Sequence, residues 1–152
     1  MSITILRIAA ALYAAGAAAY ILYFARPIHQ KAVRYGFWLV AVGFLVHGAS
    51  IGAACKEYGG TEFFNLRGGF GLLGWVGAGA FLLLQRVYPI PAVGAFILPL
   101  VLMAVLPGFF GLGPHAHGQL PNVIGKPALT VHISTALGGI ALFLIAFGVA
   151  LM

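Results

Sequence analysis

Long runs of apolar residues, separated by short polar connectors, dominate this sequence. Each run has about 20 residues, and at about 1.5 Å per residue a helix of that length crosses a hydrocarbon core of about 30 Å. Strands are a poor alternative, because lipid leaves no water to satisfy the backbone groups at an open sheet edge. The pattern therefore predicts an all-α, polytopic membrane bundle in one domain, with five transmembrane helices over about residues 4–24, 36–55, 68–86, 90–112 and 129–151.

The composition excludes several classes of protein. Charged residues make up 7% of the chain, whereas a soluble domain carries roughly 25%. Glu57 and Glu62 are the only acids, so paired-carboxylate hydrolysis, a nucleophile–His–acid set and a carboxylate-rich metal site are all excluded. The single cysteine, Cys55, excludes an internal disulfide framework. The net charge of +6 is spread over the ends of apolar runs, so we expect no nucleic-acid partner.

The basic residues predict an orientation. Four lie on one side of the expected bundle, namely Arg26, Lys31, Arg34 and Arg86. On the other side, both acids accompany three basic residues, namely Lys56, Arg67 and Lys126. Because cytoplasmic loops carry the excess of Lys and Arg, this distribution places the N-terminus outside and the C-terminus in the cytoplasm.

Glycines recur at intervals of three in the third apolar run, at Gly68, Gly71, Gly74 and Gly77. This spacing puts a stripe without side chains along one helix, so another group can approach the backbone closely. Two readings remain open. A neighbouring helix packs against the stripe, as small residues permit in lipid, or the stripe lines a groove for a flat ligand.

Two histidines, His47 and His132, lie within or at the edge of apolar runs. An imidazole in hydrocarbon is costly unless it is paired or functional, so each is a candidate site residue. His47 is expected about 12 Å and His132 about 5 Å from the outer end of its helix. One haem held between both rings would therefore require helix tilt. The alternative for each is a hydrogen bond to a neighbouring Ser, Tyr or carbonyl group.

The other three histidines are expected in connectors. His29 lies beside basic residues, where a solvated or headgroup-facing role is expected. His115 and His117 form a His-x-His motif in an outer loop. Such a pair can hold a metal ion but lacks a third ligand here, so solvated loop histidines are the alternative.

Several short motifs resemble one family. Residues 130–134 (TVHIS) open the last apolar run and resemble the His-x-Ser helix entry of the CcsA/ResC and HemX/YpjD-type membrane proteins of cytochrome c assembly and haem metabolism. His47, residues 65–67 (NLR) and residues 70–75 look like the family's helix-two histidine, outer-loop asparagine and Phe-to-Trp helix, in the same order. The resemblance implies that His132 is an outward-facing axial ligand of haem iron, in the inner (plasma) membrane of a bacterial cell.

The resemblance covers the N-terminal half of such a protein. The family's tryptophan-rich outer loop and the histidine beyond it have no counterpart, since the only tryptophans are Trp38 and Trp75. We therefore expect either a piece of a longer protein or a reduced relative that completes its core with another polypeptide or a second copy. Arg67 also departs from the family pattern, which shows a tyrosine and an acid after the asparagine.

Two functional hypotheses follow. In the first, the chain binds or presents haem on the outer side: His132 ligates the iron, His47 holds haem in transit, and outer-side cations pair with the propionates, the candidates being Lys56, Arg67 and Lys126. An apocytochrome c would then be a partner, although haem attachment would need the missing half. In the second, the chain is a non-catalytic transmembrane subunit of a larger complex. A transporter is less favoured, because no intramembrane acid is available for ion coupling.

Overall fold

The computed structural model describes residues 2–26, 30–58, 66–110 and 126–150, and all five elements found there are helices. In chain order they are α1 (Ser2–Ala25), α2 (Gln30–Tyr58), α3 (Leu66–Val87), α4 (Pro91–Phe109) and α5 (Lys126–Ala150). Each is long and apolar enough to cross a membrane. The prediction of an all-α fold with five such helices is thereby confirmed over the described residues.

The helix ends differ most from the predicted spans in α2, and one end each of α4 and α5 differs by three residues. Helix α2 starts at Gln30, six residues before the predicted start, because Gln, Lys and Arg are good helix formers although they are polar. Helix α4 starts after Ile90, with Pro91 at its first position, and ends at Phe109. The predicted span to residue 112 is wrong at Phe110, which is a turn residue whose amide donates to the Leu106 carbonyl.

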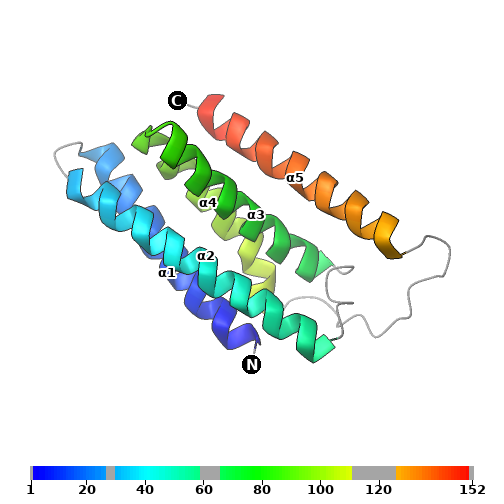
Figure 1. The fold of residues 1–152 in the computed structure, drawn as a ribbon. Coiled ribbons are helices and arrows are strands. Elements are labelled where there is room, and N and C mark those ends of the chain that lie inside the picture. Colours follow the sequence, from blue (N-terminus) through cyan, green and yellow to red (C-terminus); the bar gives the residue numbers. More distant parts are fainter. Residues whose placement is uncertain (1, 27–29, 59–65, 111–125, 151–152) are drawn as a thin grey trace.

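Four helices form a closed ring around the core. Helix α1 packs against α2 and α4, and α3 packs against the same two helices from the other side. Helix α5 lies outside this ring, along α3 and α4 (Figure 1). The largest fully buried side chains of the core come from the ring: Tyr13, Tyr20, Phe81, Ile97 and Leu98.

The glycine stripe of α3 is where α3 meets α4. A Cβ atom built on Gly74 would lie 2.6 Å from Val105 Cγ2 and 3.4 Å from the Val101 carbonyl oxygen. One on Gly77 would lie 3.3 Å from Val101 Cγ2. At these two positions the glycine therefore allows close helix packing, the first of the two readings offered by the sequence.

The two ends of the bundle are named after residues of α1. We call them the Ser2 end, where α1, α3 and α5 begin, and the Ala25 end, where these helices finish. At the Ser2 end, the Ser2 amide and hydroxyl donate to the Glu57 carboxylate, at 3.4 and 2.7 Å. The Arg7 side chain donates to the Phe109 carbonyl at 3.5 Å and lies over the Phe109 ring. The start of α1 is thus tied to the last turns of α2 and α4.

Candidate functional site

His47 lies inside the helix ring, near the Ser2 end. Its side chain is 1% exposed, and Nδ1 lies 3.4 Å from the hydroxyl oxygen of Tyr13 on α1. The two rings meet edge to face, with centroids 5.8 Å apart and planes at 64°. Tyr13 is itself fully buried. The imidazole therefore has a hydroxyl partner, as the alternative interpretation of the sequence required.

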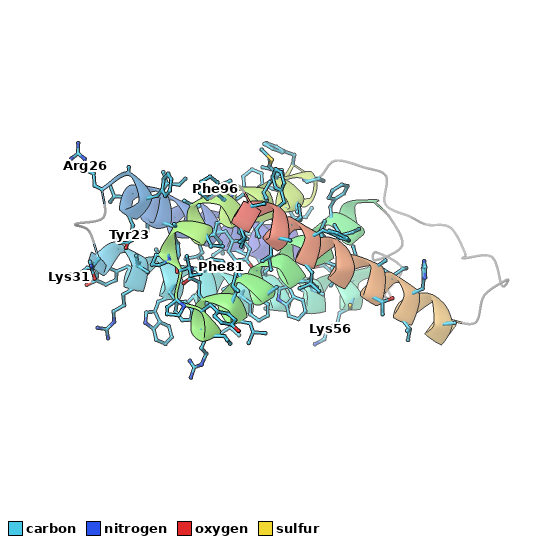
Figure 2. All side chains as sticks on the ribbon, turned by 90° about the horizontal axis from the view of Figure 1, so that it is seen from above. Tyr23, Arg26, Lys31, Lys56, Phe81 and Phe96 are labelled. Carbon is cyan, nitrogen blue, oxygen red and sulfur yellow. The ribbon has the colours of Figure 1, made fainter. Side chains whose placement is uncertain are left out.

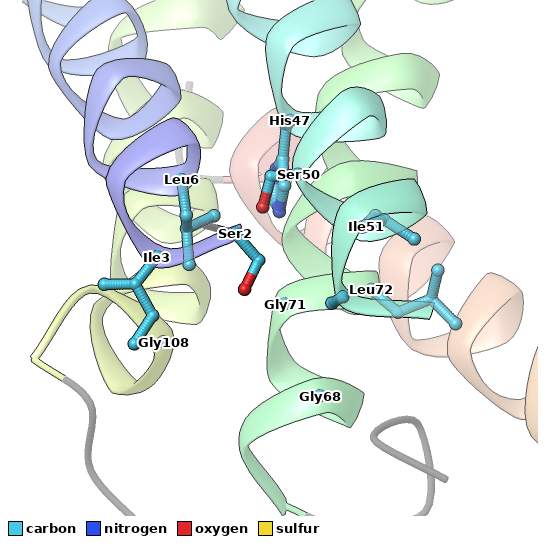
Figure 3. Close-up of a pocket in the computed structure, with 11 residues that line it drawn as sticks. Ser2, Ile3, Leu6, His47, Ser50, Ile51, Gly68, Gly71, Leu72 and Gly108 are labelled. Carbon is cyan, nitrogen blue, oxygen red and sulfur yellow. The ribbon is translucent and has the colours of Figure 1, made fainter. Parts of the chain in front are cut away.

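A small cavity lies beside His47, between α1, α2 and α3, and Gly108 of α4 also lines it (Figure 3). Its volume is about 50 Å³, which is room for one or two water molecules at about 30 Å³ each. His47 and Ser50 extend from α2 toward this space, and Ser2 borders it from α1. The cavity thus gathers three polar side chains, Ser2, His47 and Ser50, within a lining that is otherwise apolar.

The glycine stripe contributes to this cavity as well. Gly68 and Gly71, one turn of α3 apart, line it, and nothing lies within 4 Å of a Cβ atom built on Gly71. The stripe thus has two different surroundings along its length. Toward the Ala25 end it packs against α4, and toward the Ser2 end it borders the His47 cavity.

Trp75, the end of the Phe-to-Trp motif, holds α3 against α2. Its ring stacks on Phe44 with centroids 4.8 Å apart and planes at 6°. The indole nitrogen donates to the Phe44 carbonyl at 3.1 Å, and Gly48 leaves room for the indole edge. This motif therefore fixes the helix that borders His47.

His132 has a different environment. Its side chain is exposed, six residues after the first residue of α5. The nearby Thr135 hydroxyl lies 2.9 Å from the carbonyl oxygens of both Val131 and His132, so it bonds to the backbone of its own helix. The imidazole of His132 is therefore presented on the outside of the bundle, where a ligand can reach it.

The structure does not bring the two candidate histidines together. Helix α2 packs against α1 and α3, whereas α5 packs against α3 and α4, so α3 stands between the helix of His47 and the helix of His132 (Figure 1). From the observed helix ends, His47 lies about 16 Å and His132 about 9 Å along its helix from the Ser2 end. A haem sandwiched by both rings is incompatible with this arrangement.

A porphyrin also exceeds the space at His47. Small-molecule pockets have volumes of about 300–1,000 Å³, whereas this cavity has about 50 Å³. Haem at His47 would require α1 and α3 to move apart. The exposed ring of His132 fits an axial ligand without any such movement.

Several predicted residues lie outside the described part of the chain. These are His29, His115 and His117, together with the side chains of Arg67 and Lys126. Lys56 is described, and it is exposed near the Ser2 end (Figure 2). Within the described residues no group of three His, Cys, Asp or Glu side chains could hold a metal ion.

Sequence reasoning did not name Tyr13, the hydroxyl partner of His47, or Ser2 and Ser50, which line the cavity beside it. Ser50 had a detectable signal, since positions three apart on a helix share a face. Tyr13 and Tyr20, seven residues apart in an alanine-rich run, also carry the spacing of one buried face. Which helix that face meets is set by tertiary packing, and the sequence pattern does not specify it.

Comparison with known proteins gives no match: no family model, no curated protein and no solved structure matches this chain. The class of protein is therefore defined by the fold. It is an all-helical protein whose five described helices are long and apolar enough to cross a membrane.

Proposed function

We propose that this chain is an integral membrane protein that binds or presents haem through His132 at the Ser2 end of the bundle. The observation that carries the proposal is the exposed imidazole of His132, close to the start of an apolar helix. A nitrogen ligand of this kind is a common axial ligand of haem iron. The likeness of residues 130–134 to the helix entry of the CcsA/ResC and HemX/YpjD-type proteins supports the same role.

The proposed orientation places the Ser2 end on the outer side of a bacterial inner membrane. Four basic residues lie in or beside the connectors of the Ala25 end, namely Arg26, Lys31, Arg34 and Arg86. In or beside the connectors of the Ser2 end there are three, Lys56, Arg67 and Lys126, while Arg7 lies within α1. The connector excess of one basic residue marks the cytoplasmic side in this proposal. His132 is then presented outward, where an apocytochrome c would be a partner.

Bound haem would supply the iron, which the imidazole nitrogen would coordinate. The chain's own contribution is to present His132 and to place cations near the same end for the propionates, with Lys56, Arg67 and Lys126 as candidates. His47 would contact haem only in a state where α1 and α3 are separated. The rest of the binding platform would come from another membrane polypeptide or a second copy.

The proposal is tested by titrating haem into detergent-purified protein and following the Soret absorption band. The wild type is expected to give a saturable, shifted band, and His132→Ala is expected to weaken binding at least about tenfold, as loss of an iron ligand implies. His47→Ala is the matched control, because it removes a buried imidazole and leaves His132 in place. Equal binding by the wild type and His132→Ala would contradict the proposal.

A second candidate is favoured by the surface of α5. Large apolar side chains are exposed along this helix, namely Val131, Ile140, Leu142, Phe143, Phe147 and Val149. A transmembrane subunit that packs α5 against another membrane polypeptide would cover them. This candidate predicts no haem-dependent band in any variant, together with co-purification of a stoichiometric membrane partner.

A further inference from the structure

A second cavity lies at the Ala25 end, far from the proposed haem ligand. Its volume is about 310 Å³, within the range of about 300–1,000 Å³ that small-molecule sites occupy. Apolar walls come from Val33 and Phe37 on α2 and from Pro89 and Pro91 at the α3–α4 turn. The remaining lining residues are polar, so the cavity combines an apolar wall with donor groups.

Tyr20 on α1 lines this cavity and is fully buried. Within the described residues its hydroxyl has no hydrogen-bond partner. The ring is held by Phe81, edge to face at 5.3 Å, and by Gly94, where a Cβ atom would lie 2.5 Å from the ring. A buried hydroxyl left unpaired is costly. The hydroxyl has no accessible surface, so an acceptor atom bound in the cavity would satisfy it once the groups that cover the hydroxyl shift.

Arg34 on α2 lines the same cavity and is exposed at its edge. A guanidinium group binds phosphate or carboxylate oxygens in a bidentate manner. Gln85, another lining residue, is already engaged: its amide nitrogen donates to the Ile90 carbonyl at 2.8 Å and fixes the α3–α4 turn. Arg34 therefore supplies the charge that a bound anion would meet.

The surroundings of the cavity are basic. Arg26 and Lys31 flank it in sequence and lie at the same end of the molecule as Tyr23 (Figure 2). The only acids of the chain are Glu57, at the opposite end of α2, and Glu62, in the connector that follows. No carboxylate on the helices at the Ala25 end therefore competes for Arg34, and the local potential favours an anion.

We propose that this cavity binds the phosphate group of an anionic ligand, with the Arg34 guanidinium as its charge partner and the Tyr20 hydroxyl as a hydrogen-bond donor. Basic pockets between membrane helices on the cytoplasmic side bind anionic lipid headgroups in this way, and the orientation proposed above places the cavity on that side. A phospholipid headgroup and a soluble phosphate ester share this chemistry. The site rests on the proposed orientation but not on haem binding, because it lies at the other end of the bundle.

The test uses the full chain, delipidated in a zwitterionic detergent, and measures thermal unfolding during titration with phosphatidylglycerol, phosphatidylcholine or glycerol phosphate. Phosphatidylglycerol is expected to raise Tm, and phosphatidylcholine to have little effect. Arg34→Gln is expected to raise the half-saturating concentration about tenfold, as loss of a charge-assisted hydrogen bond implies. Tyr20→Phe, which keeps the buried ring, is expected to weaken binding in the same direction.

Arg26→Gln is the matched control, since it removes one charge at the same end but from a residue that does not line the cavity. Its effect on the half-saturating concentration is expected to stay below about twofold, because an exposed charge outside the site is screened.

An equal loss of binding in Arg26→Gln and Arg34→Gln, or no loss of binding in Arg34→Gln, would overturn the proposed site. Stabilisation by glycerol phosphate would support the phosphate site and assign its source to a soluble ester, whereas stabilisation by the lipid alone assigns it to the membrane. Arg34→Gln is also titrated with haem. Unchanged haem binding in this variant would show that its loss of phosphate binding concerns this site and not the haem site.

Discussion

At the scale of single residues, two tyrosines of α1 show how similar positions acquire different roles. Tyr13 and Tyr20 lie seven residues apart on one face, and both are fully buried. The Tyr13 hydroxyl contacts His47, whereas the Tyr20 hydroxyl has no partner among the described residues. The sequence predicts His47 as a candidate because an imidazole stands in an apolar run. It does not predict the partner, because the contact joins residues 34 positions apart.

These two tyrosines allow a paired prediction. Tyr13→Phe is expected to lower the free energy of unfolding by about 1–2 kcal/mol, because it removes the hydroxyl partner of a buried imidazole. In delipidated protein, Tyr20→Phe is expected to raise it by about 1 kcal/mol, because it removes an unpaired buried hydroxyl. Thermal unfolding in the same detergent measures both changes, with exposed Tyr88→Phe as the control. Two changes of the same sign would contradict these roles.

At the scale of elements, the apolar runs predict the existence and type of every described helix, because their length and hydropathy leave few other structures in lipid. Helix ends were harder to predict. Polar residues such as Lys31 extend α2 beyond its apolar run, and an apolar residue, Phe110, already lies outside α4. Hydropathy reports which residues prefer lipid, whereas helix ends depend on local backbone geometry.

The glycines of α3 provide a prediction at this scale. Gly74→Ala would place a Cβ atom 2.6 Å from Val105 on α4, and overpacking of this kind costs about 1–3 kcal/mol. At Gly71 the same substitution meets nothing within 4 Å, so higher helix propensity should stabilise the protein by about 0.5–1 kcal/mol. Chemical denaturation of the two variants in detergent compares them directly. If Gly74→Ala were as stable as Gly71→Ala, the close contact of α3 and α4 would be refuted.

At the scale of the whole molecule, the arrangement of helices was the least predictable feature. Helices α4 and α5 are apolar around most of their circumference, so the sequence pattern does not mark which face packs inward. Helix α5 lies outside the ring, where Ala141 packs with Leu73 of α3 and Ala104 of α4, and this position separates His132 from His47. The same position gives His132 its exposed ring.

The orientation of the molecule is open to a direct chemical test. In a Cys55→Ala background, Lys56→Cys and Tyr88→Cys place single thiols at exposed positions on opposite ends of the bundle. With the Ser2 end outside, a membrane-impermeant maleimide is expected to label Lys56→Cys in intact cells. Tyr88→Cys should react only after the cells are permeabilised. The reverse labelling pattern would invert the proposed topology and place His132 on the cytoplasmic side.

Ligation of haem iron by His132 is decided by the Soret spectrum of the purified protein after haem addition and desalting. We expect a retained, shifted band in the wild type and in His47→Ala, and loss of the band in His132→Ala. A band of equal position and intensity in all three proteins, or no retained band in any of them, would contradict it.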